Sequence, residues 1–108
     1  MKNNLLFLLA LFCVSCGKMI DCKEKTQSIS NERCELVVSS APTAYSSFKV
    51  VGYDPATKTQ KTCETSNRWW DLYVKEISVG DTIVKKKGSS IFSIHKKDTI
   101  INHVYKCY

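Results

Sequence analysis

The residues best suited to chemistry in this chain are its six cysteines: Cys13, Cys16, Cys22, Cys34, Cys63 and Cys107. A thiol can carry a lipid, form a disulfide or bind zinc, and its surroundings and spacing decide among these. The first two cysteines lie in an apolar N-terminal segment, whereas the other four are spread through the remainder of the chain. The two groups therefore predict different chemistry.

Cys16 follows a segment that is typical of exported proteins. Met1–Asn4 carries a positive charge, and Leu5–Val14 is an uninterrupted apolar run. This run is shorter than the roughly 20 residues of a membrane-spanning helix, but it suits the apolar region of a signal peptide. Val14-Ser15-Cys16 resembles a bacterial lipobox, in which cleavage precedes a cysteine that carries diacylglycerol. We predict a signal peptide over residues 1–15 and lipid attachment at Cys16; an ordinary signal peptide is the alternative.

Four cysteines remain after such a cleavage, and export would place them in an oxidising compartment. Two disulfides are expected, each contributing about 2–4 kcal/mol to stability. A zinc site is the alternative, but zinc ligands usually include close pairs such as C-x₂₋₄-C, whereas the gaps here are 12, 29 and 44 residues. Four cysteines allow three pairings. We expect Cys22–Cys34 with Cys63–Cys107, which closes a short loop and pins the C-terminal strand.

The segments that must position these cysteines are predicted to be mainly β. Residues 16–33 are polar without periodicity and predict a tether. The short β-branched segments 34–39, 47–53 and 59–64 predict strands. Ala41-Pro42 should end the first strand, and Asp54-Pro55 should form a turn after the second. Residues 34–108 are therefore expected to form one small domain.

The segment 67–77 fits two structures. Trp69, Tyr73 and Ile77 recur at the spacing of one helix face, which favours a short helix. Alternate apolar residues over Trp70–Val74 would also suit a strand. We predict the helix.

The last third of the chain predicts an antiparallel meander of strands over 82–86, 90–96 and 99–107. A two-residue turn at Lys97-Asp98 would pair His95 with Ile100 and Phe92 with His103. This register gives one apolar core face: Phe92, Ile94, Ile101 and Tyr105. The expected fold is a small antiparallel β-meander, sandwich or barrel-like domain with one short helix, stapled by disulfides.

The chain is basic, with 15 Lys and Arg against 10 Asp and Glu from Cys16 onward, a net charge of +5. Lysines near the strand ends, together with the aromatic residues of segment 67–77, form the candidate binding surface: Trp69, Trp70, Tyr73, Lys85, Lys86, Lys87, Lys96 and Lys97. An anionic envelope surface or a protein partner would suit it; nucleic acid is not expected for an exported protein. In the alternative interpretation, the lysines protect strand edges and the aromatic residues cover the core.

Motifs for catalysis are not apparent. There is no glycine-rich phosphate loop and no G-x-S-x-G sequence. S-x-x-K occurs at Ser46 and Ser93, but in strands residues three apart point to opposite faces. The predicted hairpin register places His95 and His103 on opposite faces, so they are not expected to share a metal. The C-x-x-C spacing of Cys13 and Cys16 lies in a targeting segment, which lacks the folded context of a redox site. We expect no catalytic residue, no metal and no cofactor, and hence a non-enzymatic protein.

The order of elements after the lipobox is similar to that of small uncharacterised lipoproteins of Bacteroidota-type bacteria. An aromatic pair at Trp69-Trp70, a Gly80-Asp81 turn, a lysine run at 85–87 and a Lys-Lys-Asp-Thr hairpin at 96–99 carry the resemblance. It implies an outer-membrane lipoprotein, on the periplasmic or the surface face, and transfers no catalytic residue. A binding or structural role is expected; the alternative is an immunity or inhibitor lipoprotein that binds a toxin or hydrolase in the periplasm.

Overall fold

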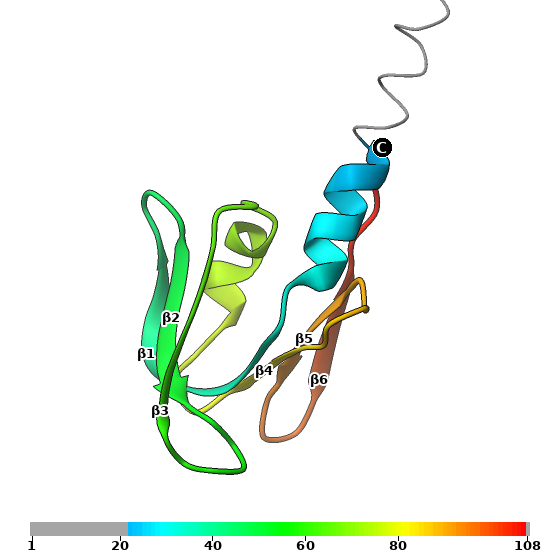
Figure 1. Ribbon diagram of the computed structural model, residues 1–108. Helices are drawn as coiled ribbons and strands as arrows, with labels where there is room; N and C mark the ends of the chain where they lie inside the picture. Colours follow the sequence, from blue (N-terminus) through cyan, green and yellow to red (C-terminus); the bar gives the residue numbers. More distant parts are fainter. Residues whose placement is uncertain (1–21, 108) are drawn as a thin grey trace, which may run out of the picture.

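Six antiparallel strands form a single sheet in the computed structural model, which describes residues 22–107 (Figure 1). The strands are β1 (Cys34–Ala44), β2 (Phe48–Tyr53), β3 (Gln60–Thr65), β4 (Thr82–Lys85), β5 (Ile91–His95) and β6 (Ile100–Val104). Their order across the sheet is β3-β2-β1-β4-β5-β6. The prediction of a mainly β, antiparallel domain is confirmed. The predicted signal peptide and Cys16 lie outside the described residues.

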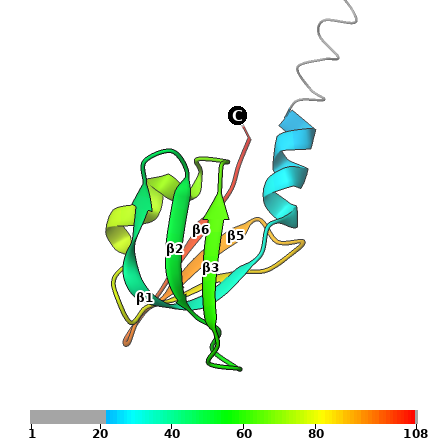
Figure 2. The same cartoon turned by 60° about the vertical axis from the view of Figure 1, so that its left-hand side comes forward.

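The sheet bends at β1, which is shared between its two halves. The first residues of β1, Cys34–Val37, pair with β4, and the stretch from Val37 to Ala44 pairs with β2. The β1–β2 register shifts twice between Val38 and Thr43, and such bulges bend and twist a strand. As a result β1–β3 and β4–β6 face each other across the core (Figures 1 and 2). The predicted strand end at Ala41-Pro42 is wrong, since the second shift spans Pro42 and pairing resumes beyond it.

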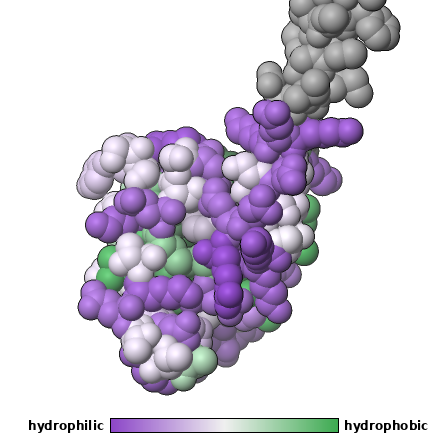
Figure 3. Space-filling view, viewed as in Figure 1, coloured by the Kyte–Doolittle hydropathy of each residue, from purple (hydrophilic) through white to green (hydrophobic). Residues whose placement is uncertain are grey.

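The core between the two halves is rich in aromatic residues. The 3₁₀ helix η1 (Trp70–Glu76) confirms the predicted short helix and carries Trp70 into the core. The Trp70 ring centroid lies 5.4 Å from that of Phe48 on β2 and 5.1 Å from that of Phe92 on β5. Trp70 therefore joins the two halves of the sheet. In contrast to this apolar core, the surface seen in Figure 3 is mostly hydrophilic.

The register predicted for β5 and β6 is confirmed. His95 pairs with Ile100, and Phe92 pairs with His103. Phe92 and Ile94 are fully buried, and Ile101 and Tyr105 pack against the same core. The predicted core face is therefore the observed one.

Residues 22–31 form a helix, which corrects the expectation of a tether over this stretch. Ile29 is its one fully buried apolar residue, so the segment lacks the periodic apolar stripe that would have predicted a helix. Directly after the helix, the Glu32 carboxylate accepts hydrogen bonds from the Thr65 hydroxyl (2.9 Å) and the Asn67 amide (2.8 Å). These contacts fix the helix to the end of β3 and the loop before η1.

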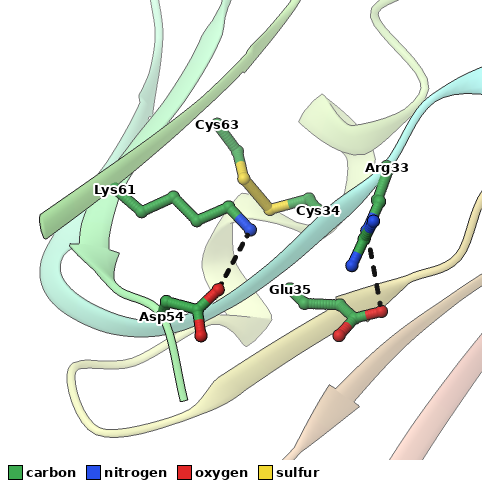
Figure 4. Close-up of a disulfide and its surroundings, with 6 residues drawn as sticks. All are labelled: Arg33, Cys34, Glu35, Asp54, Lys61 and Cys63. Carbon is green, nitrogen blue, oxygen red and sulfur yellow. Dashed lines mark ion pairs between the residues drawn. A yellow bond between two sulfur atoms is a disulfide. The ribbon is translucent and has the colours of Figure 1, made fainter. Parts of the chain in front are cut away.

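Two disulfides are present, as predicted, but the predicted pairing is wrong. Cys34 bonds to Cys63, which joins β1 to β3 inside the core (Figure 4), and Cys22 bonds to Cys107. The intervening helix explains the error: ten helical residues extend about 15 Å, whereas the Cα atoms of a disulfide lie within about 7 Å of each other. Cys22 and Cys34 are thus held apart at opposite ends of the helical segment.

Candidate functional site

Much of the predicted binding surface is buried. Trp69 and Trp70 are 7% and 1% exposed, and Tyr73 is half-buried. The Trp69 indole N–H donates to the Tyr73 hydroxyl (2.8 Å), and its ring packs edge-on against Phe92. The two tryptophans therefore form no binding platform; they belong to the core, as the alternative interpretation held.

Lys85 is also misplaced in the predicted surface, because it is fully buried. It shares the inner face of β4 with Ile83. Its ammonium group donates to the carbonyl oxygens of Glu32 (2.9 Å), Ser30 (3.2 Å) and Lys86 (2.8 Å). Burial lowers the pKa of Lys85, and the nearby Glu32 carboxylate acts in the opposite direction. Lys85 has a structural role in joining the helix 22–31 to the sheet.

The remaining lysines do not form one patch. Lys86 and Lys87 are exposed in the turn after β4, whereas Lys96 and Lys97 follow β5. The two turns lie at opposite ends of β5 (Figure 1). Lys96 is also paired, with its ammonium group 2.5 Å from the Asp81 carboxylate. The positive charge of Lys86, Lys87 and Lys97 is therefore divided between the two ends of the meander.

Between these lysines lies the outer face of the meander, which sequence reasoning did not single out. We define the outer face as the side chains of β4–β6 that point away from the core: Thr82, Val84, Ile91, Ser93, His95, Ile100, Asn102 and Val104. Three of them are large, apolar and exposed: Ile91 (42%), Ile100 (55%) and Val104 (55%). Most solvent-facing sheet surfaces are polar, so this mixed surface is suited to contact with a partner.

The centre of the outer face is ordered by a side-chain hydrogen bond. The Ser93 hydroxyl donates to the Asn102 amide oxygen at 2.5 Å, across directly paired positions of β5 and β6. A shallow groove of about 520 Å³ runs over this pair, between Val84, Ile91 and Val104. The apolar signal was visible in the sequence, because Ile91, Ile100 and Val104 alternate with the predicted core residues.

The two histidines lie on opposite faces, as predicted. His95 belongs to the outer face. His103 points inward, where its ring stacks on Tyr73 at 3.7 Å and its Nε2 lies 3.0 Å from the Glu76 carboxylate. Within residues 22–107, no three His, Cys, Asp or Glu side chains are grouped as metal ligands.

Neither helix of the described region is long and apolar enough to cross a membrane. Comparisons of the chain with models of protein families, with curated proteins and with solved structures find no match.

Proposed function

We propose that this chain is a lipid-anchored protein of the cell envelope, of the outer-membrane lipoprotein type, with a non-enzymatic binding role. The lipobox-like Val14-Ser15-Cys16 sequence supports the anchor. The two disulfides support the oxidising compartment, because disulfides are rare in proteins that remain in the cytosol. The exposed outer face is the surface proposed to bind.

The Cys22–Cys107 disulfide lies close to the proposed anchor in the sequence. Cys22 follows Cys16 by six residues and is bonded to Cys107. The proposed lipid would therefore be attached six residues before the point where the N-terminal helix is covalently joined to the residues that follow β6. An acyl chain contributes about 0.8 kcal/mol for each buried CH₂, so several chains would hold the domain firmly at a membrane.

Replacement of the proposed lipid-bearing cysteine tests the anchor. In a bacterial host with lipoprotein processing, the native chain should incorporate a palmitate probe and sediment with the outer membrane. Cys16→Ser should abolish both, whereas Cys13→Ser should leave both unchanged. A Cys16→Ser chain that is still labelled and still sediments with membranes contradicts the proposed anchor.

The outer face offers the chemistry of the binding role. Exposed Ile91, Ile100 and Val104 provide apolar contact, and Lys86 and Lys97 provide positive charge at the two ends. A partner with apolar groups and anionic flanks is complementary to this arrangement. Affinity capture from solubilised envelopes should retain such a partner with the native chain and lose it with Ile91→Asp, whereas Thr62→Asp on β3 should retain it.

An immunity or inhibitor lipoprotein remains the second candidate. The exposed apolar residues of the outer face support it, because Trp69 and Trp70 are buried and cannot contact a partner. In that case the captured partner is a toxin or hydrolase whose activity falls on binding. Capture of a partner with no such activity, or capture that survives Ile91→Asp, contradicts this candidate.

A further inference from the structure

The strand β6 lies at one end of the sheet, and its outer edge pairs with no other strand of residues 22–107 (Figure 1). The hydrogen bonds between β5 and β6 show which backbone groups of β6 are already paired and which point outward. Lys96 N–H donates to Thr99 O, and Tyr105 N–H donates to Ser90 O, each at 2.8 Å. Along an antiparallel strand, the backbone N–H and C=O groups of successive residues point alternately to one neighbouring strand and to the opposite side. Ile101, His103 and Tyr105 therefore turn their backbone groups to β5, and the intervening residues turn theirs outward.

The outward groups belong to Ile100, Asn102 and Val104, whose side chains also lie on the outer face. Ile100 and Val104 are each 55% exposed, and Asn102 is exposed. A row of open donors and acceptors beside apolar side chains is the usual template for pairing with another strand.

The sequence along this edge is complementary to itself. The outward residues along β6 are Ile100, Asn102 and Val104, with Asp98 in the turn before the strand and Lys106 just after it. A reversed copy centred on Asn102 places a valine opposite the isoleucine and an asparagine opposite itself, and it brings the end that carries Lys106 to the end that carries Asp98. Asp98 and Lys106 are both exposed.

We propose that β6 pairs antiparallel with β6 of a second copy of this chain, about a two-fold axis at Asn102. In this register Ile100 pairs with Val104 of the other copy, and the turn that carries Asp98 in one copy lies at the same end of the interface as Lys106 of the other. The outward backbone groups of all three edge residues become hydrogen-bonded. Such an interface uses the same surface on both copies, as the closed symmetry of a dimer requires.

The opposite end of the sheet has no such complementarity. By the same alternation, β3 turns the backbone groups of Gln60, Thr62 and Glu64 outward, since Asp54 N–H donates to Thr59 O. These three residues are polar or charged and are exposed. A reversed copy of β3 would place Gln60 opposite Glu64, without apolar contact and without opposite charges. The β3 edge is therefore the matched control for the β6 edge.

Pairing of β6 would also change the outer face. The two copies would form one continuous twelve-stranded sheet from their six strands each, with Ile100 and Val104 of both copies side by side at its centre. Attachment to a common membrane would raise the local concentration of the two copies and promote pairing. The dimer itself depends only on the β6 edge, so it can be tested separately from the lipid anchor.

A single added cysteine at the two-fold axis tests the proposal in the full chain. The Cα atoms of a directly hydrogen-bonded antiparallel pair lie about 5.5 Å apart, within disulfide range. Under mild oxidation of the cells that express it, Asn102→Cys should form a dimer that is reversed by reductant. Thr62→Cys, at the centre of the β3 edge, should form at least tenfold less dimer.

The register is tested by a mixed experiment. Ile100→Cys and Val104→Cys, each expressed alone, should crosslink weakly, whereas co-expression of two differently tagged chains should give the mixed dimer. Peptide mapping of each product must show the native Cys22–Cys107 and Cys34–Cys63 bonds intact. Equal crosslinking of Asn102→Cys and Thr62→Cys, no crosslinking of either, or a crosslink of Asn102→Cys only to a different protein would overturn the proposed dimer.

A second variant separates pairing from folding. Asn102→Pro removes an outward N–H that takes no part in the bonds to β5, and proline is tolerated on edge strands. In an Ile100→Cys and Val104→Cys mixture that also carries Asn102→Pro, the mixed dimer should fall at least fivefold while the native disulfides still form. Undiminished crosslinking would contradict hydrogen bonding between the two β6 edges.

Discussion

The ammonium group of Lys85 on β4 lies 2.9 Å from the carbonyl oxygen of Glu32, at the junction between the helix 22–31 and β1. It also binds the carbonyl oxygen of Ser30 at 3.2 Å, near the C-terminal end of that helix. A positive charge is favoured at this end because the helix dipole is negative there. A single buried lysine thus fastens the N-terminal helix to the middle of the sheet.

Replacement of Lys85 should destabilise the domain. Lys85→Met keeps most of the side-chain volume but leaves buried carbonyl oxygens without their donor, at a cost of about 1–3 kcal/mol. The neighbouring Lys86 is exposed, so Lys86→Met should change the free energy of unfolding by less than about 0.5 kcal/mol. Urea unfolding of the two variants measures the difference. Equal values for both would contradict the structural role of Lys85.

The lowered pKa of Lys85 predicts a pH dependence of stability. Between the folded pKa and the ordinary value of 10.5, the unfolded chain binds the proton that the folded protein has released. Stability therefore rises with pH over this interval and is independent of this group at lower pH. The difference in unfolding free energy between the native chain and Lys85→Met should be constant near neutrality and grow as the pH approaches 10.5. A difference that shrinks with rising pH would contradict the burial of Lys85.

A glycine is required at position 52, where β2 pairs with β1 beside the first register shift of that strand. It pairs with Val38, and a Cβ atom at this position would overlap the carbonyl oxygen of Val37 and the Leu36 side chain. Gly52→Ala should therefore lower the free energy of unfolding by about 1–3 kcal/mol or more. Gly88 has a positive φ of 88° but open space around it, and asparagine tolerates positive φ better than most residues. Gly88→Asn should lower the thermal midpoint less than Gly52→Ala; the reverse order would argue against the close strand contact.

Local patterns predicted the parts of the fold that local chemistry determines. Alternation placed the strands to within about a residue at most ends, and the turn at Lys97-Asp98 fixed the β5–β6 register. Asp54 accepts hydrogen bonds from the backbone N–H groups of Ala56 and Thr57, which is the turn chemistry that its sequence indicates. These bonds also lower the pKa of Asp54.

The failures involve contacts that are distant in the sequence. Lys85 was grouped with the exposed lysines, although the alternation of β4 already places it on the same face as Ile83. The helix 22–31 is held in place by Ile29, by Lys85 and by a disulfide. It therefore needs no wide apolar face, and its sequence shows no apolar stripe from which a helix could be predicted. The cysteine pairing depends on that helix, and so could not be predicted before it.

The two disulfides should differ in their resistance to reduction. Cys34 and Cys63 are buried in the core, whereas Cys22 and Cys107 are both partly exposed, and thiol exchange requires access to a sulfur atom. Under native conditions with a mild reductant, alkylation followed by peptide mass analysis should label Cys22 and Cys107 at least tenfold faster than Cys34 and Cys63. In urea, where both bonds are accessible, the four rates should converge. Faster labelling of Cys34 and Cys63 in the native protein, or peptides that join Cys22 to Cys34, would contradict the observed pairing and the position of the helix between them.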